Sequence, residues 1–427
     1  MRGHGDRTAS ILAVGSELLG TNRTDTNSLF LTAGLETLGI KVVRKACSGD
    51  GWDDLAAEVR IALERAPLLV LTGGLGPTDD DRTKEVVAHV FGRQLVRDEE
   101  ILTGLRERFA RRGFPMPKVN EKQADVIEGA TVLGNSRGSA PGYFVDDGEK
   151  VAVLLPGVPM EMRGMWSEAA APLVKARFPS AGGIHRRTLK VAGLAESVVE
   201  ERIKSVYAAF PDDPVTILAG AGEILLQFTA QGDEEAGRRL DQIEAAFREV
   251  LADEIFGRDD ETIEAVVGEL FRKAGKTLAV AESCTGGTLA GRITDAPGSS
   301  DYFLGGAVTY ANEAKVALAG VDRATLERFG AVSEETAREM AEGIRRSFGA
   351  SVGFAVTGIA GPSGGTPGKP VGLVHVALAD QDGTAVHRRL QLPGDRAMVR
   401  RWTTSLALSM MRFHLLGIRR EAREAGR

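Results

Sequence analysis

The sequence predicts an α/β fold in which two α/β domains with mainly parallel sheets are joined by a small α+β module. Three observations predict it. Short apolar runs closed by glycines alternate with amphipathic stretches near both ends of the chain, which is the pattern of βαβ units. Between residues 186 and 256 the apolar residues recur with period two instead, as in half-buried strands. The length of 427 residues also fits two or three domains of ordinary size.

The first part of the chain predicts alternating strands and helices. The apolar run at 68–72 is short, continuous and closed by glycines, so we expect a buried strand there. The ligands of such sheets collect at the carboxyl ends of the strands, so a site is expected at that edge. The same patterns predict further strands at 10–14, 40–44 and 151–159, helices at 28–38 and 55–66, and a first domain over residues 1–176.

The rest of the chain predicts a small module followed by a second α/β domain. The module is expected over residues 177–257, because two segments of period-two apolar residues alternate there with two helical patterns. The last domain is expected over residues 258–427. The predicted elements are strands at 187–193 and 223–230 with helices at 195–209 and 234–252 in the module, and strands near 277–282, 305–310, 352–357 and 371–378 in the last domain.

Composition disfavours several classes of protein. A net charge of −6 supplies no general electrostatic footprint for nucleic acid, so no direct nucleic-acid binding is expected. Two cysteines that lie far apart cannot make a disulfide framework or a four-ligand zinc site. The chain starts without an apolar signal region and has no uncharged run long enough to span a bilayer. We expect a cytoplasmic protein without a membrane partner.

The most informative motif is the run A-E-S-C-T-G-G at 281–287, which falls between a predicted strand and a predicted helix. Ser283 lies in the turn, where backbone amides at a helix start can stabilise an oxyanion or a phosphate. Thr285 and Gly286 follow it, and glycine lets a ligand approach closely. The structural alternative is that Ser283 or Thr285 only caps the helix.

A serine hydroxyl needs a base, and no histidine lies in these motifs. Lys315 is the natural substitute, because a partly desolvated lysine loses its proton more easily and can then deprotonate Ser283. Tyr310 could relay or orient that proton, and Asn312 belongs to the same Y-x-N-x-x-K cluster. Cys284 is a rival nucleophile, since a helix start lowers the pKa of a thiol. The sequence leaves the choice between Ser283 and Cys284 open.

A second glycine-rich run, at 357–365, is expected to meet Ser283 at the same edge of the sheet. Glycine-rich loops can form concave amide nests for anions, although a flexible turn is the simpler alternative. Lys369 is a further candidate for a substrate phosphate. Together the motifs predict acyl-transfer chemistry on a phosphorylated small molecule. The predicted substrate-binding residues are Thr285, Gly286, Asn312, Thr357, Gly358, Gly361 and Arg396.

The second dense motif lies in the first domain, at 69–85. It lacks the Gly-Lys-Ser/Thr of a Walker loop and the third glycine of a dinucleotide fingerprint. Three aspartates beside a glycine loop would repel phosphates, unless a divalent cation such as Mg²⁺ takes carboxylate and phosphate oxygens together. Helix capping by Thr78 or Asp79 is the alternative. The predicted metal ligands are Asp79, Asp80 and Asp81, and the other predicted residues of this site are Glu17, Gly73, Gly74, Gly76, Thr78 and Lys84.

The motifs of the last domain, with G-G-A-V-T-Y-A-N-E-A-K at 305–315, resemble the carboxy-terminal domain of the CinA family (competence/damage-inducible protein A) over roughly 260–418. That resemblance implies a nicotinamide mononucleotide deamidase, which converts its substrate to nicotinate mononucleotide and ammonia. It implies Ser283 as nucleophile, Lys315 and Tyr310 as its activators, and Thr357 and Arg396 as substrate contacts. No cofactor is implied for this reaction.

The first domain resembles the molybdopterin-binding fold, and more closely the amino-terminal domain of the same family, through the motif at 69–85, G-S-E-L-L-G-T-N at 15–22, N-S-R-G-S-A-P-G-Y at 135–143 and L-P-G-V-P-M-E-M at 155–162. The resemblance implies a metal-dependent ADP-ribose pyrophosphatase. The chain departs from the family pattern at Ser16 and in the run 24–27, which weakens this expectation. The middle module resembles a KH-type domain without a basic G-x-x-G clamp, so we expect it to serve as a spacer and an oligomer contact rather than to bind RNA.

The leading hypothesis is therefore a nucleotide-salvage hydrolase that acts on nicotinamide mononucleotide and ADP-ribose, two products of NAD breakdown, and forms a homodimer. A pterin-cofactor binding protein without amino-terminal catalysis is the first alternative. A competence-related partner in DNA transactions is the second, although the acidic balance disfavours direct DNA contact.

Overall fold

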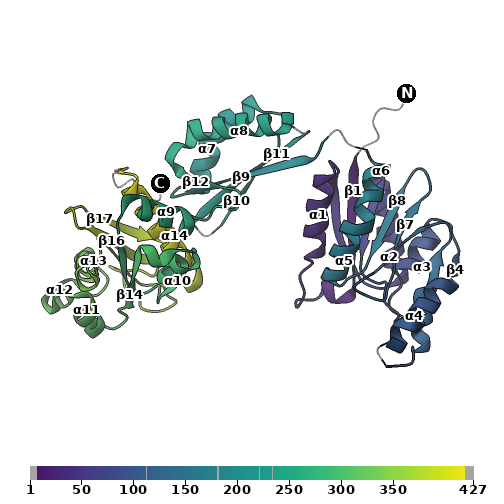
Figure 1. Ribbon diagram of the computed structural model, residues 1–427. Helices are drawn as coiled ribbons and strands as arrows, with labels where there is room; N and C mark the ends of the chain where they lie inside the picture. The colour runs from purple at the N-terminus through teal and green to yellow at the C-terminus, as the bar shows by residue number, and fades with distance from the viewer. Residues whose placement is uncertain (1–6, 112, 180–181, 221, 233, 419–427) are drawn as a thin grey trace. The chain divides into compact units, whose positions relative to one another are not determined.

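The structure is a computed structural model that describes residues 7–111, 113–179, 182–220, 222–232 and 234–418 (Figure 1). The chain divides into two compact units, one of Met1–His185 with Ala230–Arg239 and the other of Arg186–Thr229 with Leu240–Arg427. A six-stranded sheet lies in the first unit and a five-stranded sheet in the second. The predicted α/β class is confirmed. None of the described helices is long and apolar enough to cross a membrane.

The sheet of the first unit has the strand order β2-β1-β3-β8-β7-β6. Its first four strands are parallel, and β7 and β6 are added antiparallel at one side. All residues of β3 and β8 are buried, as the continuous apolar runs predict. The strands are β1 (Thr8–Val14), β2 (Lys41–Ser48), β3 (Leu68–Thr72), β6 (Thr131–Leu133), β7 (Gly142–Asp146) and β8 (Val151–Leu155).

Helices cover both faces of this sheet (Figure 1). One face packs against α2 (Trp52–Arg65) and α3 (Thr83–Val90), and the other against α1 (Asn27–Thr37) and α5 (Pro159–Met165). The segment between α3 and β8, where the sequence analysis placed no elements, contributes a helix and two short paired strands as well as β6 and β7. The remaining elements are η1 (Ser16–Leu19), β4 (Leu95–Arg97), α4 (Glu99–Arg111), η2 (Lys118–Ala124), β5 (Asp125–Ile127), η3 (Trp166–Ala170) and α6 (Ala171–Arg177).

The middle of the chain forms a four-stranded sheet with the order β10-β11-β9-β12 and two long helices. Alternate residues of β11 are buried, as its period-two pattern predicts. The two helices fall where the periodicity places them, within one residue at each end. The elements are β9 (Ile184–Ala192), α7 (Glu196–Ala209), β10 (Val215–Ala219), β11 (Glu223–Gln231), α8 (Glu234–Leu251), η4 (Ala252–Glu254) and β12 (Ile255–Arg258).

The five-stranded sheet of the second unit has the order β14-β13-β15-β16-β17. Strands β14 (Phe303–Val308), β13 (Leu278–Glu282) and β15 (Val352–Gly358) are parallel. β16 (Leu373–Asp380) and β17 (Ala385–Gln391) run antiparallel, so this sheet is mixed rather than mainly parallel, and β17 has no predicted counterpart.

Apolar side chains on the two faces of this sheet pack against different sets of helices. One set is α9 (Ile263–Ala274), α10 (Thr288–Asp295) and α14 (Arg396–Leu415). The other is α11 (Asn312–Ala319), α12 (Arg323–Phe329) and α13 (Glu334–Phe348), with η5 (Ser299–Asp301) preceding β14. The carboxyl ends of the three parallel strands meet at one edge, where the predicted motifs lie.

Candidate active site

Ser283 lies in a tight turn between the buried strand β13 and helix α10. The backbone N–H of Gly286 donates to the carbonyl of Ser283 at 3.1 Å, which closes the turn. The N–H of Ser283 donates to the carbonyl of Val356 on the neighbouring strand β15, at 2.9 Å. Only 8% of Ser283 is exposed. A strand, a sharp turn and a helix thus hold a serine hydroxyl at the carboxyl edge of the sheet, as in a nucleophile elbow.

Lys315 meets this serine from α11. Its amine nitrogen Nζ lies 3.2 Å from Ser283 Oγ, 2.7 Å from the carbonyl oxygen of Thr309 and 3.3 Å from that of Tyr310. Lys315 is 1% exposed, and burial lowers the pKa of its amine. A neutral amine satisfies all three partners, because its two N–H groups donate to the carbonyls and its lone pair accepts from the serine hydroxyl. The geometry fits a lysine that removes the proton of Ser283.

The rival nucleophile points elsewhere. Cys284 is 5% exposed and belongs to the apolar cluster between the sheet and helices α9, α10 and α14. Burial raises the pKa of its thiol to about 12. A thiol that stays protonated is a weak nucleophile, so the structure favours Ser283 for that role.

The hydrogen bond between Lys315 and Tyr310 is accepted by the backbone carbonyl of Tyr310. Its side chain is 60% exposed, and its hydroxyl accepts a hydrogen bond of 3.0 Å from Arg396. Arg396 also donates to the carbonyl of Gly361 at 3.0 Å. The predicted proton relay through the Tyr310 hydroxyl therefore has no support in the hydrogen bonds of the described residues. Arg396, in the first turn of α14, instead links the Y-x-N-x-x-K cluster to the glycine-rich run at 357–365.

The other predicted substrate residues occupy three different environments. Thr357 is fully buried, and its hydroxyl donates to the carbonyl of Ala331 at 2.6 Å, which ties β15 to the segment before α13. Gly358 packs closely against β16, where a Cβ would lie 2.8 Å from the carbonyl oxygen of Leu373. Asn312 is exposed at the start of α11. The other phosphate candidate, Lys369, donates to the carbonyl of Phe329 at 2.6 Å.

Two charged residues that the sequence analysis did not select hold the Ser283 turn. Glu282 is 1% exposed, and its carboxylate accepts from the backbone N–H groups of Gly287, Leu289 and Ala290 at 2.7–3.0 Å. Arg400, one helical turn after Arg396, donates from Nε and Nη2 to the carbonyl of Thr285 at 3.2 and 2.7 Å. Glu282 stands inside the A-E-S-C-T-G-G motif, but no local signal marks Arg400.

In the first unit, the glycines after β3 lie so close to other parts of the protein that a larger side chain would not fit. Gly73 and Gly74 have φ angles of 107° and 66°, values that L side chains rarely adopt. A Cβ would lie 2.1 Å from the carbonyl oxygen of Val14 at the first and 2.1 Å from the Thr83 hydroxyl at the second. At Gly76 it would lie 2.3 Å from the Asp81 carboxylate. This loop thus brings the end of β1, the start of α3 and the acidic run together.

The three predicted metal ligands do not form one cluster. Asp79 and Asp80 are exposed. Asp81 turns back, and its carboxylate accepts from the N–H and the hydroxyl of Thr78 at 3.0 and 2.5 Å, as a capping aspartate does. The described residues contain no group of three or more histidine, cysteine or acidic side chains placed to hold a metal ion. Glu17 is exposed on η1, and none of the hydrogen bonds or ion pairs of the described residues joins it to the acidic run.

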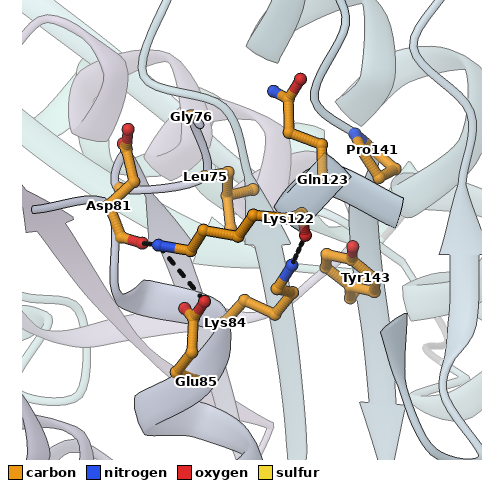
Figure 2. A pocket seen from close by; sticks show the side chains of 10 residues that line it. Leu75, Gly76, Asp81, Lys84, Glu85, Lys122, Gln123, Pro141 and Tyr143 are labelled. Carbon is orange, nitrogen blue, oxygen red and sulfur yellow. Dashed lines mark hydrogen bonds and ion pairs between the residues drawn. The ribbon is translucent and has the colours of Figure 1, made fainter. Parts of the chain in front are cut away.

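A small cavity of about 10 Å³ lies beside this acidic run, and Figure 2 shows its lining. The amine of Lys122 contacts the carbonyls of Thr78 and Asp81 and forms an ion pair with Glu85 at 3.3 Å. Lys84 is 5% exposed, donates to the carbonyl of Lys122 at 2.7 Å, and has a pKa lowered by burial. The amine of Lys122 therefore supplies positive charge next to the aspartates.

Comparisons with known proteins agree with this architecture. The models of three families match in order: the probable molybdopterin binding domain over residues 10–176, the damage-inducible protein CinA KH domain over 186–257, and the CinA C-terminal domain over 260–415. A CinA-like protein of Koribacter versatilis is 42% identical over 96% of this chain and 100% of its own. Another, of Gemmatimonas aurantiaca, is 43% identical over 97% of each chain.

Among solved structures, the competence/damage inducible protein CihA of Agrobacterium tumefaciens matches 36% of this chain and 97% of its own, with 40% identity and a TM-score of 0.35. The order of the three matched domains and the identity along almost the whole length of the two relatives show the family. The chain belongs to the CinA family of competence/damage-inducible proteins, with a molybdopterin-binding-like domain, a KH-like module and a CinA C-terminal domain.

Proposed function

We propose that the second unit hydrolyses the carboxamide of nicotinamide mononucleotide to nicotinate mononucleotide and ammonia, with Ser283 as nucleophile and Lys315 as base. The observation that carries the proposal is the 3.2 Å contact between a buried lysine amine and a serine hydroxyl, with two backbone carbonyls as the amine's other partners. The family resemblance supplies the substrate.

The residues support a balanced two-step reaction. Ser283 Oγ bonds to the carboxamide carbon while its proton passes to Lys315 Nζ, and a tetrahedral oxyanion forms. The carbon–nitrogen bond then breaks, and the departing nitrogen takes a proton from the Lys315 ammonium and leaves as ammonia. In the second step water attacks the acyl-serine, again giving a proton to Lys315. Breaking the ester bond returns that proton to Ser283 Oγ and releases nicotinate mononucleotide.

Arg396 supports recognition of a phosphorylated substrate. It is exposed at the start of α14, and its guanidinium already bridges Tyr310 and Gly361 from the two loops around the site. A guanidinium can bind phosphate with two parallel hydrogen bonds.

The direct test measures ammonia release from nicotinamide mononucleotide by the purified full chain. Ser283→Ala removes only the hydroxyl and is expected to abolish release while the circular dichroism spectrum stays unchanged. A wild-type chain that releases no ammonia from this substrate would refute the proposed function. A Ser283→Ala variant with full activity would refute the nucleophile.

A second proposed activity is metal-dependent hydrolysis of ADP-ribose by the first unit. The observation that favours it is the exposed pair Asp79 and Asp80 next to Gly76 and the lysine-lined cavity of Figure 2. The pair does not make a closed metal cage. Mg²⁺ usually takes one or two protein carboxylates, with water and substrate phosphates in the remaining positions, and Asp79 and Asp80 would supply those carboxylates here. When bound there, the ion would neutralise phosphate charge during cleavage of the anhydride.

Chelation separates the two proposed activities. EDTA, or Asp80→Ala, is expected to stop ADP-ribose hydrolysis and to spare ammonia release, because serine acylation uses an amine base and no metal. Loss of both activities in EDTA, with the protein still folded by circular dichroism, would mean that the deamidation site needs the ion. The homodimer and the lack of nucleic-acid binding stay predictions of the sequence.

A further inference from the structure

The N-terminus of α10, next to the nucleophile, is already bound by a carboxylate of the protein itself. Glu282 accepts hydrogen bonds from Gly287, Leu289 and Ala290, the amides that a helix start would otherwise offer to an anion. The carboxylate also offsets the positive end of the helix dipole. The start of α10 is therefore not the place where an oxyanion can bind.

The two amides that directly follow Ser283 are different. The N–H groups of Cys284 and Thr285 donate to no other residue in the described part of the chain, whereas those of Ser283 and Gly286 are bound. The Thr285 hydroxyl is also buried without a partner in the described part of the chain. Unpaired buried polar groups cost free energy, and in native structures they often mark a place that a ligand completes. The turn thus has spare donors beside the nucleophile.

Both ends of this turn are fixed by charged side chains. Glu282 holds the helix side, and its own carbonyl accepts from the N–H of Thr309 at 2.7 Å. Arg400 holds the carbonyl of Thr285 with two donors and the Thr288 hydroxyl with a third bond of 2.7 Å. A peptide is planar, so the bond from the N–H of Gly286 to the carbonyl of Ser283 also fixes the direction of the Cys284 N–H. Arg400 holds the peptide that follows Thr285, at the other end of the same turn.

We propose that the backbone N–H groups of Cys284 and Thr285 form the oxyanion hole of the deamidation site, and that Arg400 and Glu282 are positioning residues that keep these amides in place. The inference rests on the proposed function. The residue after a nucleophile supplies one oxyanion donor in nucleophile elbows, and Cys284 has that position here. The thiol of Cys284 takes no part, because the donor is its backbone.

A competing role for Arg400 is contact with the substrate phosphate, since Arg396 lies one helical turn before it. The two roles differ in what they stabilise. A phosphate contact acts on binding and disappears with a substrate that has no phosphate. A positioning role acts on the transition state and affects substrates with and without phosphate alike.

The test compares Arg400→Met with Arg401→Met in the full chain. Arg401 is the matched control, because it is the next residue of α14 and its side chain is exposed. Ammonia release is measured with nicotinamide mononucleotide, with its thioamide analogue and with nicotinamide riboside. A thioamide places sulfur where the oxyanion forms, so a well-oriented hole discriminates against it. The ratio of kcat/KM for amide and thioamide does not depend on how much of a preparation is folded.

For Arg400→Met we expect kcat to fall about 10- to 100-fold with KM nearly unchanged, because a displaced donor loses much of its stabilisation of the transition state. The amide-to-thioamide ratio should fall several-fold, and the loss should be equal for mononucleotide and riboside. Glu282→Gln should lower the same ratio. Arg401→Met should match the wild type. An unchanged ratio in Arg400→Met would overturn the positioning role, and a loss seen only with the mononucleotide would make Arg400 a phosphate contact. Inactive wild-type protein would instead refute the deamidase itself.

Discussion

Replacing Lys315 by methionine removes the amine and keeps an unbranched side chain of similar length. A general base contributes about 10²–10⁴ to the rate, so we expect ammonia release to fall by at least that factor. The carbonyl of Thr309, a fully buried residue, loses its 2.7 Å donor. A buried acceptor without a partner costs about 1–3 kcal/mol. Methionine also avoids the free-energy cost of burying an amine, which offsets part of this loss. We therefore expect Tm to fall by only a few degrees.

Lys315→Arg is the sharper variant. Arginine stays protonated, so it supplies positive charge but cannot accept the proton of Ser283. We expect no rescue of activity relative to Lys315→Met. In the wild type, kcat/KM should rise with pH through the pKa of Lys315, which burial places below the usual lysine value. The value of kcat/KM rises rather than falls with pH because the neutral amine is the active form.

The assay is initial ammonia release at saturating and limiting nicotinamide mononucleotide, repeated across pH, with thermal unfolding of each variant as the control for folding. A fully active arginine variant would reduce Lys315 to an electrostatic contact. A pH profile in which activity falls as pH rises through that pKa would mean that the ammonium, and not the amine, is the working form.

Three further predictions address neighbouring groups. Cys284→Ala should keep most deamidase activity, because the thiol lies in the core; loss of activity without loss of folding would reassign the nucleophile. Nicotinamide riboside should show kcat/KM about 10- to 100-fold below that of the mononucleotide, the equivalent of one charged hydrogen bond to Arg396; equal efficiency would remove the phosphate contact. Burial and His387 lower the pKa of His375 to about 4 from 6.5, so the folded state resists its protonation, and about 3 kcal/mol of stability should be lost as pH falls from 7 to 4. The free energy of unfolding, measured by urea titration at each pH from 7 to 4, should change less with pH in His375→Gln than in the wild type.

Most of the fold follows from local sequence pattern. The buried strands β3, β8, β13 and β15 are continuous apolar runs, and β11 alternates in burial as its sequence does. β17 could not be predicted because its sequence, Ala-Val-His-Arg-Arg-Leu-Gln, is largely polar. It lies at the edge of the sheet, where a strand need not be apolar on both faces. Strands β4, β5 and β6 of the first unit have only three residues each, too few to show a period-two pattern. β4 also pairs with β5 across helix α4, which local periodicity does not reveal.

The candidate site could be predicted only where chemistry is local. Ser283 and Lys315 stand in dense motifs, and strand order brings them to one edge. Tyr310 was assigned a relay because it is near Lys315 in sequence, yet its side chain is exposed and bonded to Arg396. Arg400 had no local signal, since its role depends on how α14 packs beside a turn 115 residues earlier in the chain.

The same physical reason limits which groups of the two predicted anion-binding motifs are free to bind a ligand. The chain uses several of the groups that a motif offers to a ligand. The amine of Lys122 contacts the carbonyl of Asp81 and so places a positive charge beside the acidic run. The Asp81 carboxylate accepts a hydrogen bond from Thr78, and the Glu282 carboxylate binds the first amides of α10. A ligand can use only donors and charges that the fold leaves over. In the second unit these are the N–H groups of Cys284 and Thr285, and the N–H groups of the exposed Arg396 guanidinium that do not bond Tyr310 or Gly361. Together they define where a carboxamide oxygen and a phosphate are expected to lie relative to Ser283.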